Sequence, residues 1–154
     1  MQKIKSILLT VLLSLATTAM MAATTNPEAV TALLNRIGGS GTADRFVTIV
    51  DESLKSSGKD VFTITAQDGK PCIKGSSTLA VATGINWYLN HYAHVNLAWN
   101  HLTTDLSGVT LPVPTTDETR TCHADYRYYL NYCTFSYSMS TWTWKRWQEE
   151  IDWM

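Results

Sequence analysis

The sequence predicts an α+β fold, in which a small antiparallel sheet carries two helices and is followed by the first β-α unit of something larger. Three observations lead to this prediction. Two segments repeat apolar residues at helical spacing, and three short strand-like runs lie between them. From Tyr126 onward the composition becomes rich in Trp and Tyr. Strands grouped together beside helices, rather than in strict alternation with them, are typical of the α+β class.

The first helix is expected to begin at Asn26-Pro27-Glu28. Asn can cap a helix, Pro fits the first helical position, and Glu is favoured near the positive end. Gly38-Gly39 is expected to stop it. Its apolar face consists of Val30, Leu33, Leu34 and Ile37.

Strands are expected at 46–50, 61–65 and 72–75. The first is β-branched and aromatic, and the second alternates between apolar and polar residues, as a half-buried strand does. The second and third are joined by Gln67-Asp68-Gly69-Lys70. Because Asp-Gly is a strong hairpin signal, the two should form a β-hairpin.

Either Ser76 or Ser77 can cap the second helix. Gly84 should let this helix lie close to the sheet, and its apolar face is formed by Leu79, Ala82, Ile85, Leu89 and Tyr92. Another strand is expected at 95–99. The stretch 103–121 reads as an edge segment and linker, because its Pro residues lack the amide donor that a central strand needs. The sequence therefore predicts an α/β domain at 24–115 and a linker at 116–125.

A further unit is expected at 126–154, with a buried strand over Tyr128–Thr134. Ser140 or Thr141 can cap a last helix, and the apolar face of that helix consists of Trp144, Trp147, Ile151 and Met154. This pattern runs to the last residue without a stop signal. The chain is therefore expected to be a fragment, with its final segment poorly held.

The N-terminus has the layout of a secretory signal peptide. Two lysines precede an apolar run, Ile7–Leu15, and small residues follow it. The run is too short for a membrane span, which needs roughly 20 apolar residues. Residues 1–22 are therefore expected to be removed on export, with cleavage after Ala22 or Ala23 left open, and the product to be secreted or periplasmic. A buried core helix is the alternative.

Without that segment the chain carries 10 basic and 13 acidic side chains, a formal charge of −3. No basic stripe remains, so neither nucleic acid nor an anionic membrane surface is an expected partner. Cys72 and Cys122 could pair in an oxidising compartment, but the spacing leaves this open. No CxxC motif is present, and His91 and His94 suit the negative end of a helix. Hence neither a metal nor a cofactor is expected.

Two segments then resemble a known family. Residues 126–138, YRYYLNYCTFSYS, and 144–154, WKRWQEEIDWM, resemble the opening of the catalytic barrel in the α-N-acetylglucosaminidase family of glycoside hydrolases. Residues 74–89, KGSSTLAVATGINWYL, resemble the helix of the small α/β domain that precedes that barrel. Gln148 departs from the family pattern, which has an acid there. The resemblance implies that 126–154 is the start of an incomplete (β/α)8-type barrel.

The resemblance also implies a function. The family removes terminal α-linked N-acetylglucosamine from glycans with retention, which needs two carboxylates about 5–5.5 Å apart. In the family both come from later barrel strands. The chain is thus expected to be a non-catalytic N-terminal portion of an exported glycoside hydrolase, inactive alone. Its expected partners are a glycan ending in N-acetylglucosamine and the remainder of the barrel. A secreted carbohydrate-binding or interaction module is the alternative.

Within the resemblance, Asn131 and Cys133 match positions that line the sugar pocket, at the strand ends where barrel enzymes place their sites. Asn can both donate to and accept from sugar hydroxyls. The alternative is a buried strand with an inert Cys. Glu149, Glu150 and Asp152 share the last helix with an apolar stripe, so a solvated face is expected there rather than a catalytic pair.

Overall fold

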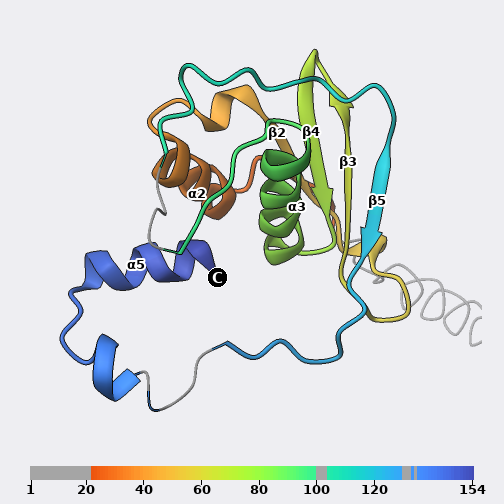
Figure 1. Ribbon diagram of the computed structural model, residues 1–154. Helices are drawn as coiled ribbons and strands as arrows, with labels where there is room; N and C mark the ends of the chain where they lie inside the picture. The colour runs from red at the N-terminus through yellow and green to blue at the C-terminus, as the bar shows by residue number, and fades with distance from the viewer. Residues whose placement is uncertain (1–21, 100–103, 130–132, 134) are drawn as a thin grey trace, which may run out of the picture.

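The computed structural model describes residues 22–99, 104–129, 133 and 135–154. The expected signal peptide, apart from its last residue, lies outside them. Figure 1 shows a sheet with two helices against it, and a third helix near the C-terminus that stands apart from the sheet. The main elements are β1 (Thr24–Thr25), α2 (Glu28–Gly38), β2 (Val47–Val50), β3 (Val61–Gln67), β4 (Lys70–Gly75), α3 (Thr78–His91), β5 (Glu118–Thr121), η4 (Phe135–Met139) and α5 (Trp144–Trp153).

The strands form one sheet in the order β1-β2-β4-β3-β5. Its pairs are antiparallel except β2 with β4, where Val47 lies opposite Cys72 and Val50 opposite Gly75 in parallel register. The α+β class is confirmed, but the expectation of an all-antiparallel sheet is wrong for this pair. The reason is that β4 returns from the hairpin and inserts between β3 and β2, so that β3 and its flanking loops act as the long connection that parallel strands need.

The hairpin between β3 and β4 turns at Asp68-Gly69, as the sequence predicts. The backbone φ is 53° at Asp68 and 71° at Gly69. Two consecutive positive φ angles define a type I′ turn, whose twist matches that of the flanking strands. This turn fixes the register in which Ile64 faces Ile73.

Helix α2 begins one residue later than its signal suggested, with Pro27 in the capping position. Asn26 adopts a φ of 48° and does not cap the helix. Its side-chain Oδ1 accepts a hydrogen bond from the Thr48 amide at 2.9 Å, which ties the start of α2 to β2. Gly39, with a φ of 92°, ends the helix as predicted.

Helix α3 is capped by Ser77, whose Oγ accepts from the Ala80 amide at 3.1 Å. It lies across β3 and β4 (Figure 1). A Cβ added at Gly84 would stand 2.7 Å from Ile73 Cγ2, closer than van der Waals contact allows. The prediction that Gly84 permits close packing on the sheet is therefore confirmed.

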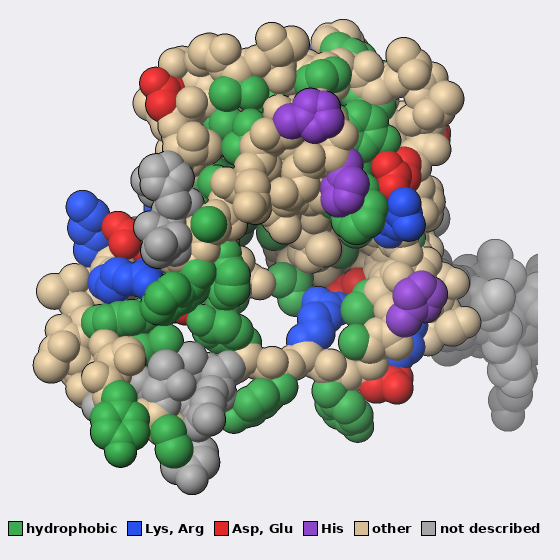
Figure 2. Space-filling view, viewed as in Figure 1, with side chains coloured by type: hydrophobic (Ala, Val, Ile, Leu, Met, Phe, Trp, Pro, Cys, Tyr) green, Lys and Arg blue, Asp and Glu red, His purple; other side chains and the backbone are tan. Residues whose placement is uncertain are grey.

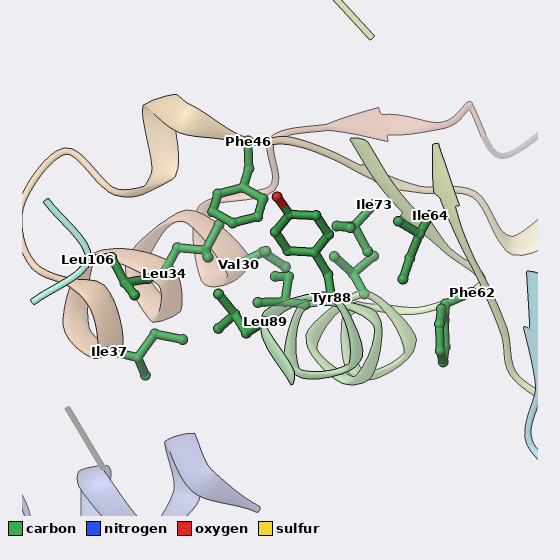
Figure 3. Packing of buried hydrophobic residues seen from close by; sticks show 12 residues of the cluster. Val30, Leu34, Ile37, Phe46, Phe62, Ile64, Ile73, Tyr88, Leu89 and Leu106 are labelled. Atoms are coloured by element: carbon green, nitrogen blue, oxygen red, sulfur yellow. The ribbon is translucent and has the colours of Figure 1, made fainter. Parts of the chain in front are cut away.

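The core lies between the sheet and the two helices (Figure 3). Phe46 and Tyr88 meet edge to face at its centre, with ring centroids 5.5 Å apart. The Tyr88 hydroxyl donates to the Pro112 carbonyl at 2.7 Å, so the buried ring keeps a polar partner. The remaining core side chains are apolar: Val30, Leu34, Ile37, Phe62, Ile64, Ile73, Val81, Ile85, Leu89 and Leu106.

Two segments differ from expectation. Residues 95–99 do not form a strand, because the chain turns at His94, with a φ of 55°, and Val95 and Leu97 then pack on the helical side of the core. Residues 118–121, which belong to the stretch read as an edge segment and linker, form the edge strand β5 and pair with β3, so only their assignment to the linker 116–125 is wrong.

The possible Cys72–Cys122 disulfide is excluded by strand register. Cys72 lies opposite Thr65 on β3, whereas Cys122 follows Thr121, which lies opposite Val61. At about 3.3 Å per residue the two cysteines are offset by at least about 13 Å along the strands. A disulfide needs Cα atoms within roughly 7 Å. Both cysteines carry thiols.

Candidate functional site at the junction with helix α5

Helix α5 is attached to the α/β domain by an ion pair. Arg36, at the end of α2, donates from Nε to Asp152 Oδ2 at 2.6 Å and from Nη2 to Oδ1 at 2.7 Å. This two-bond geometry is the strongest form of an Arg–carboxylate contact. The hydrogen bond from Arg36 to Asp152 also raises the pKa of the guanidinium.

Glu150 is the second attachment point, and its side chain is fully buried. The indole Nε1 of Trp99 donates to both carboxylate oxygens, at 2.9 and 3.0 Å. Arg146 Nη2 donates at 2.9 Å, and the Tyr129 hydroxyl donates as well. The same hydrogen bond to Glu150 raises the pKa of Tyr129. The expectation that this acid belongs to a solvated face is therefore wrong, because donors from other segments surround it.

Arg146 extends this cluster. Its guanidinium lies 4.1 Å from the ring centroid of Trp142 and 5.8 Å from that of Trp99, both within cation–π range. Its Nη1 is buried and has no hydrogen-bond partner, with Glu149 4.0 Å away. The cluster thus combines one buried carboxylate with a cation held between two indole rings.

The apolar side of α5 is largely exposed, which reverses the expected arrangement. Trp144 is 69% exposed, Ile151 50% and Met154 51%. Figure 2 shows hydrophobic side chains gathered at the lower left, over the region of α5. The helix is capped by Thr143, not by Ser140 or Thr141. It also contacts the α/β domain, where the sequence suggested a poorly held segment.

A groove of about 720 Å³ lies between α2, α3 and the end of α5. Its walls are mainly apolar and include Leu33, Ile37, Ala82, Leu97, Ile151 and Met154. The Arg36–Asp152 pair borders it. The groove therefore suits an apolar chain segment better than a charged ligand.

The predicted sugar contacts are only partly visible. Asn131 lies outside the described residues, and Cys133 is half buried and not in a disulfide. The expected buried strand is not seen at its described beginning, where Tyr128 is 86% exposed. Glu150, with no accessible surface, cannot reach a substrate as a general acid.

The end of the linker and Arg127 just after it are attached to the α/β domain at and beside Asp60. Arg127 Nη2 donates to its Oδ2 at 2.7 Å, and the hydroxyls of Ser76 and Ser77 donate to Oδ1 at 2.9 and 3.2 Å. The hydrogen bond from Arg127 is the main cause of a pKa below the usual Asp range. Lys59 pairs with Asp125 beside it.

A second aromatic cluster surrounds Trp87. Its ring stacks on His91 at 3.9 Å, and the Arg120 guanidinium lies 4.6 Å from its centroid. Glu118 accepts from Trp87 Nε1 at 3.1 Å and from the Tyr92 hydroxyl at 2.8 Å. Because the ring is already covered by these groups, it is a poor platform for a sugar. His91 has a structural role here, and the described residues hold no group of metal-ligating side chains.

The family models match this chain in two consecutive segments. Residues 28–113 match the alpha-N-acetylglucosaminidase (NAGLU) N-terminal domain, and residues 127–154 match the alpha-N-acetylglucosaminidase (NAGLU) tim-barrel domain. The fold and both matches define the N-terminal part of a glycoside hydrolase family, in which an α/β domain precedes a barrel. The chain belongs to the alpha-N-acetylglucosaminidase family, which confirms the resemblance seen in the sequence.

Individual relatives agree with this assignment. Human alpha-N-acetylglucosaminidase is 35% identical over 128 residues, which are 82% of this chain and 17% of the human enzyme. A Clostridium perfringens family 89 glycoside hydrolase with two Glu-to-Gln substitutions, in complex with its substrate GlcNAc-α-1,4-galactose, is 31% identical with a TM-score of 0.66. The same bacterial enzyme has been solved in complex with PUGNAc. The match covers 82% of this chain and 14% of the bacterial one.

The chain therefore spans less than a fifth of the length of these relatives. In the part of the chain that the structure describes, no helix has both the length and the apolar character that crossing a membrane requires.

Proposed function

We propose that this chain is the non-catalytic N-terminal portion of an exported glycoside hydrolase that removes terminal α-linked N-acetylglucosamine from glycans. The observation that supports this most is the order of the two family matches, an N-terminal domain followed by the start of a barrel. The substrate class follows from the relatives, since the bacterial enzyme binds GlcNAc-α-1,4-galactose.

The chain does not hydrolyse glycans by itself in this proposal. Retaining hydrolysis needs two accessible carboxylates about 5–5.5 Å apart. Glu150 does not meet this requirement, because it is buried and accepts hydrogen bonds from Trp99 and Arg146. Residues 23–154, purified and incubated with an aryl α-N-acetylglucosaminide, should give no turnover above background. Turnover that disappears in Glu149→Gln or Glu150→Gln would contradict this.

The remainder of the barrel is the proposed partner in cis. A chimera tests this, in which the chain from residue 23 replaces the matched segment of the human enzyme. The chimera should hydrolyse the aryl glycoside, and the human enzyme without that segment should not. A chimera that folds, by circular dichroism, but has no activity would count against the assignment.

Asn131 and Cys133 are proposed to contact the sugar in the complete enzyme. In the chimera, Asn131→Ala should raise KM by roughly fivefold, in line with the loss of about one hydrogen bond. Cys133→Ala should also raise KM. Ser138→Ala is the matched control, because Ser138 is exposed in the same segment. Unchanged kinetics in both site variants would remove these residues from the site.

Export is proposed from the N-terminal pattern of positive charge, apolar run and small residues. The product should be secreted or periplasmic and should lack residues 1–22. Intact-mass measurement of exported material tests this. Soluble exported protein that still begins at Met1 would refute it.

A carbohydrate-binding module is the second candidate. The observation in its favour is the exposure of two aromatic rings, Tyr126 at 91% and Tyr128 at 86%, since exposed aromatic rings can stack on sugars. An NMR titration of residues 23–154 with N-acetylglucosamine distinguishes the two candidates. Saturable binding that is lost in Tyr126→Ala or Tyr128→Ala would favour the module over the hydrolase segment.

A further inference from the structure

Helix α5 contacts the α/β domain mainly through hydrogen bonds and an ion pair, and its apolar Ile151 only lines the groove beside α2 and α3. The side chain of α5 that is buried is a carboxylate, Glu150, while Trp144 and Met154 are half or more exposed. A helix that packs on a core normally buries its apolar stripe. Because Ile151 and Met154 remain about half exposed, hydrophobic burial accounts for only a minor part of where α5 lies.

The contacts that do hold α5 are directional and lie within its last turn and a half. Glu150 accepts from Trp99, Asp152 accepts from Arg36, and Trp153 Nε1 donates to the Leu97 carbonyl at 3.2 Å. Their partners come from two separate places on the α/β domain, the end of α2 and the segment after α3. Two separated anchor points fix both the angle of a helix and its register along its axis.

We propose that the α/β domain is a docking platform for the first helix of the barrel. Arg36 and Trp99 are its recognition residues, and Asp152 and Glu150 are the matching acids on the helix. The exposed part of the apolar side of α5, where Trp144 is 69% exposed, then stays available for the remaining barrel polypeptide. The docking of α5 takes place within this chain and does not depend on the proposed function. The proposed function enters only where the polypeptide that covers the exposed side of α5 is identified as the rest of the barrel.

Hydrogen exchange on residues 23–154, followed by mass spectrometry, tests the platform. Amides of 144–153 should be protected in the unmodified chain. Arg36→Gln and Asp152→Asn should each speed exchange in α5 by at least about tenfold and leave exchange in α3 unchanged. The double variant should exchange no faster than either single variant, because both remove the same contact. Lys145→Gln, at an exposed position of α5, is the control and should have no effect.

Three results would overturn the platform. One is an unprotected α5 in the unmodified chain. Another is a hydrogen-exchange rate of the α5 amides that is the same in Arg36→Gln and in Glu150→Gln as in the unmodified chain. Two variants are used so that the test still holds if one of them folds poorly. The last is an equal loss of protection in α3 and α5, which indicates general destabilisation. Hydrolysis by the chimera is measured separately, so the proposed function and the platform fail independently.

Discussion

The indole N–H of Trp99 lies 2.9 Å from Oε1 and 3.0 Å from Oε2 of Glu150, a residue 51 positions later in the chain. Glu150 has no accessible surface and also accepts from Arg146 at 2.9 Å. A buried carboxylate is costly unless it is paired and hydrogen-bonded, and these donors supply that compensation.

Glu150→Ala should lower the free energy of unfolding by about 3 kcal/mol, the lower end of the range for breaking a buried ion pair. The lower end applies because Arg146 keeps 28% side-chain exposure and can regain water. Urea denaturation measures the change. Glu149→Ala, whose carboxylate is 4.0 Å from Arg146 and partly exposed, should cost less than about 1 kcal/mol. Equal effects of the two variants would contradict the buried role of Glu150.

Gly75→Ala should destabilise the α/β domain. A Cβ at this position would stand 2.6 Å from the Val81 amide nitrogen and 2.8 Å from its Cγ2. Because a backbone atom at the start of α3 cannot move aside cheaply, we expect a loss of about 2–3 kcal/mol. Gly108→Ala is the control, since a Cβ there meets nothing within 4 Å. Thermal denaturation should separate the two variants clearly, and similar midpoints would refute the close approach.

Asp60 should make stability depend on acid pH. The hydrogen bond from Arg127 is the main cause that lowers its folded pKa below the unfolded value of 3.8. Ionised Asp60 therefore contributes stability that is complete above the unfolded pKa and is lost as pH falls through the folded pKa. The stability difference between the unmodified chain and Asp60→Asn should shrink below about pH 4. Unfolding free energies measured from pH 6 to pH 2.5 test this, and a constant difference would contradict it.

Tyr88 should make the stability of the fold depend on alkaline pH. Burial raises its pKa to about 12, from 10.0 for a free side chain. Since the folded chain then holds the Tyr88 proton more tightly than the unfolded chain, protonated Tyr88 contributes to the free energy of unfolding. This contribution is complete below pH 10 and is lost between pH 10 and 12. At pH 7, Tyr88→Phe should cost about 1 kcal/mol through the lost bond to the Pro112 carbonyl. The difference in unfolding free energy between the unmodified chain and Tyr88→Phe, measured by urea denaturation, should narrow from pH 9 to pH 11.5. A gap that widens would refute this.

Local signals in the sequence predicted most of the α/β domain. The Asp68-Gly69 turn, the helix cap at Ser76 or Ser77 and the close approach at Gly84 all depend on residues near in sequence, and all three are confirmed, with Ser77 as the cap. The parallel pairing of β2 with β4 and the addition of β5 were not predictable in this way. They depend on pairing between strands that are distant in the sequence, which the spacing of apolar residues within one strand does not encode.

The sequence predicted the residue pattern of α5 but not the contacts that α5 makes with the α/β domain. The sequence marked an apolar stripe and a run of acids on the last helix, but it assigned the acids to solvent. Burial of Glu150 depends on an indole donor 51 residues away, and Asp152 depends on Arg36 at a separation of 116 residues. No spacing rule within a helix contains that information. The family resemblance located the barrel segment but not its partners.

Both partners of α5 precede it in the chain, and this has a consequence for how the protein is made. Synthesis proceeds from the N-terminus at about 5–20 residues per second, so Trp99 is complete roughly 3–10 s before Glu150. Mixed α/β domains of this size fold in milliseconds to seconds. The surface that receives α5 can thus be in place when the helix is translated. In the proposed complete enzyme, the barrel would then grow from a helix whose position is already set, which would shorten the time that the exposed indole of Trp144 spends without a partner.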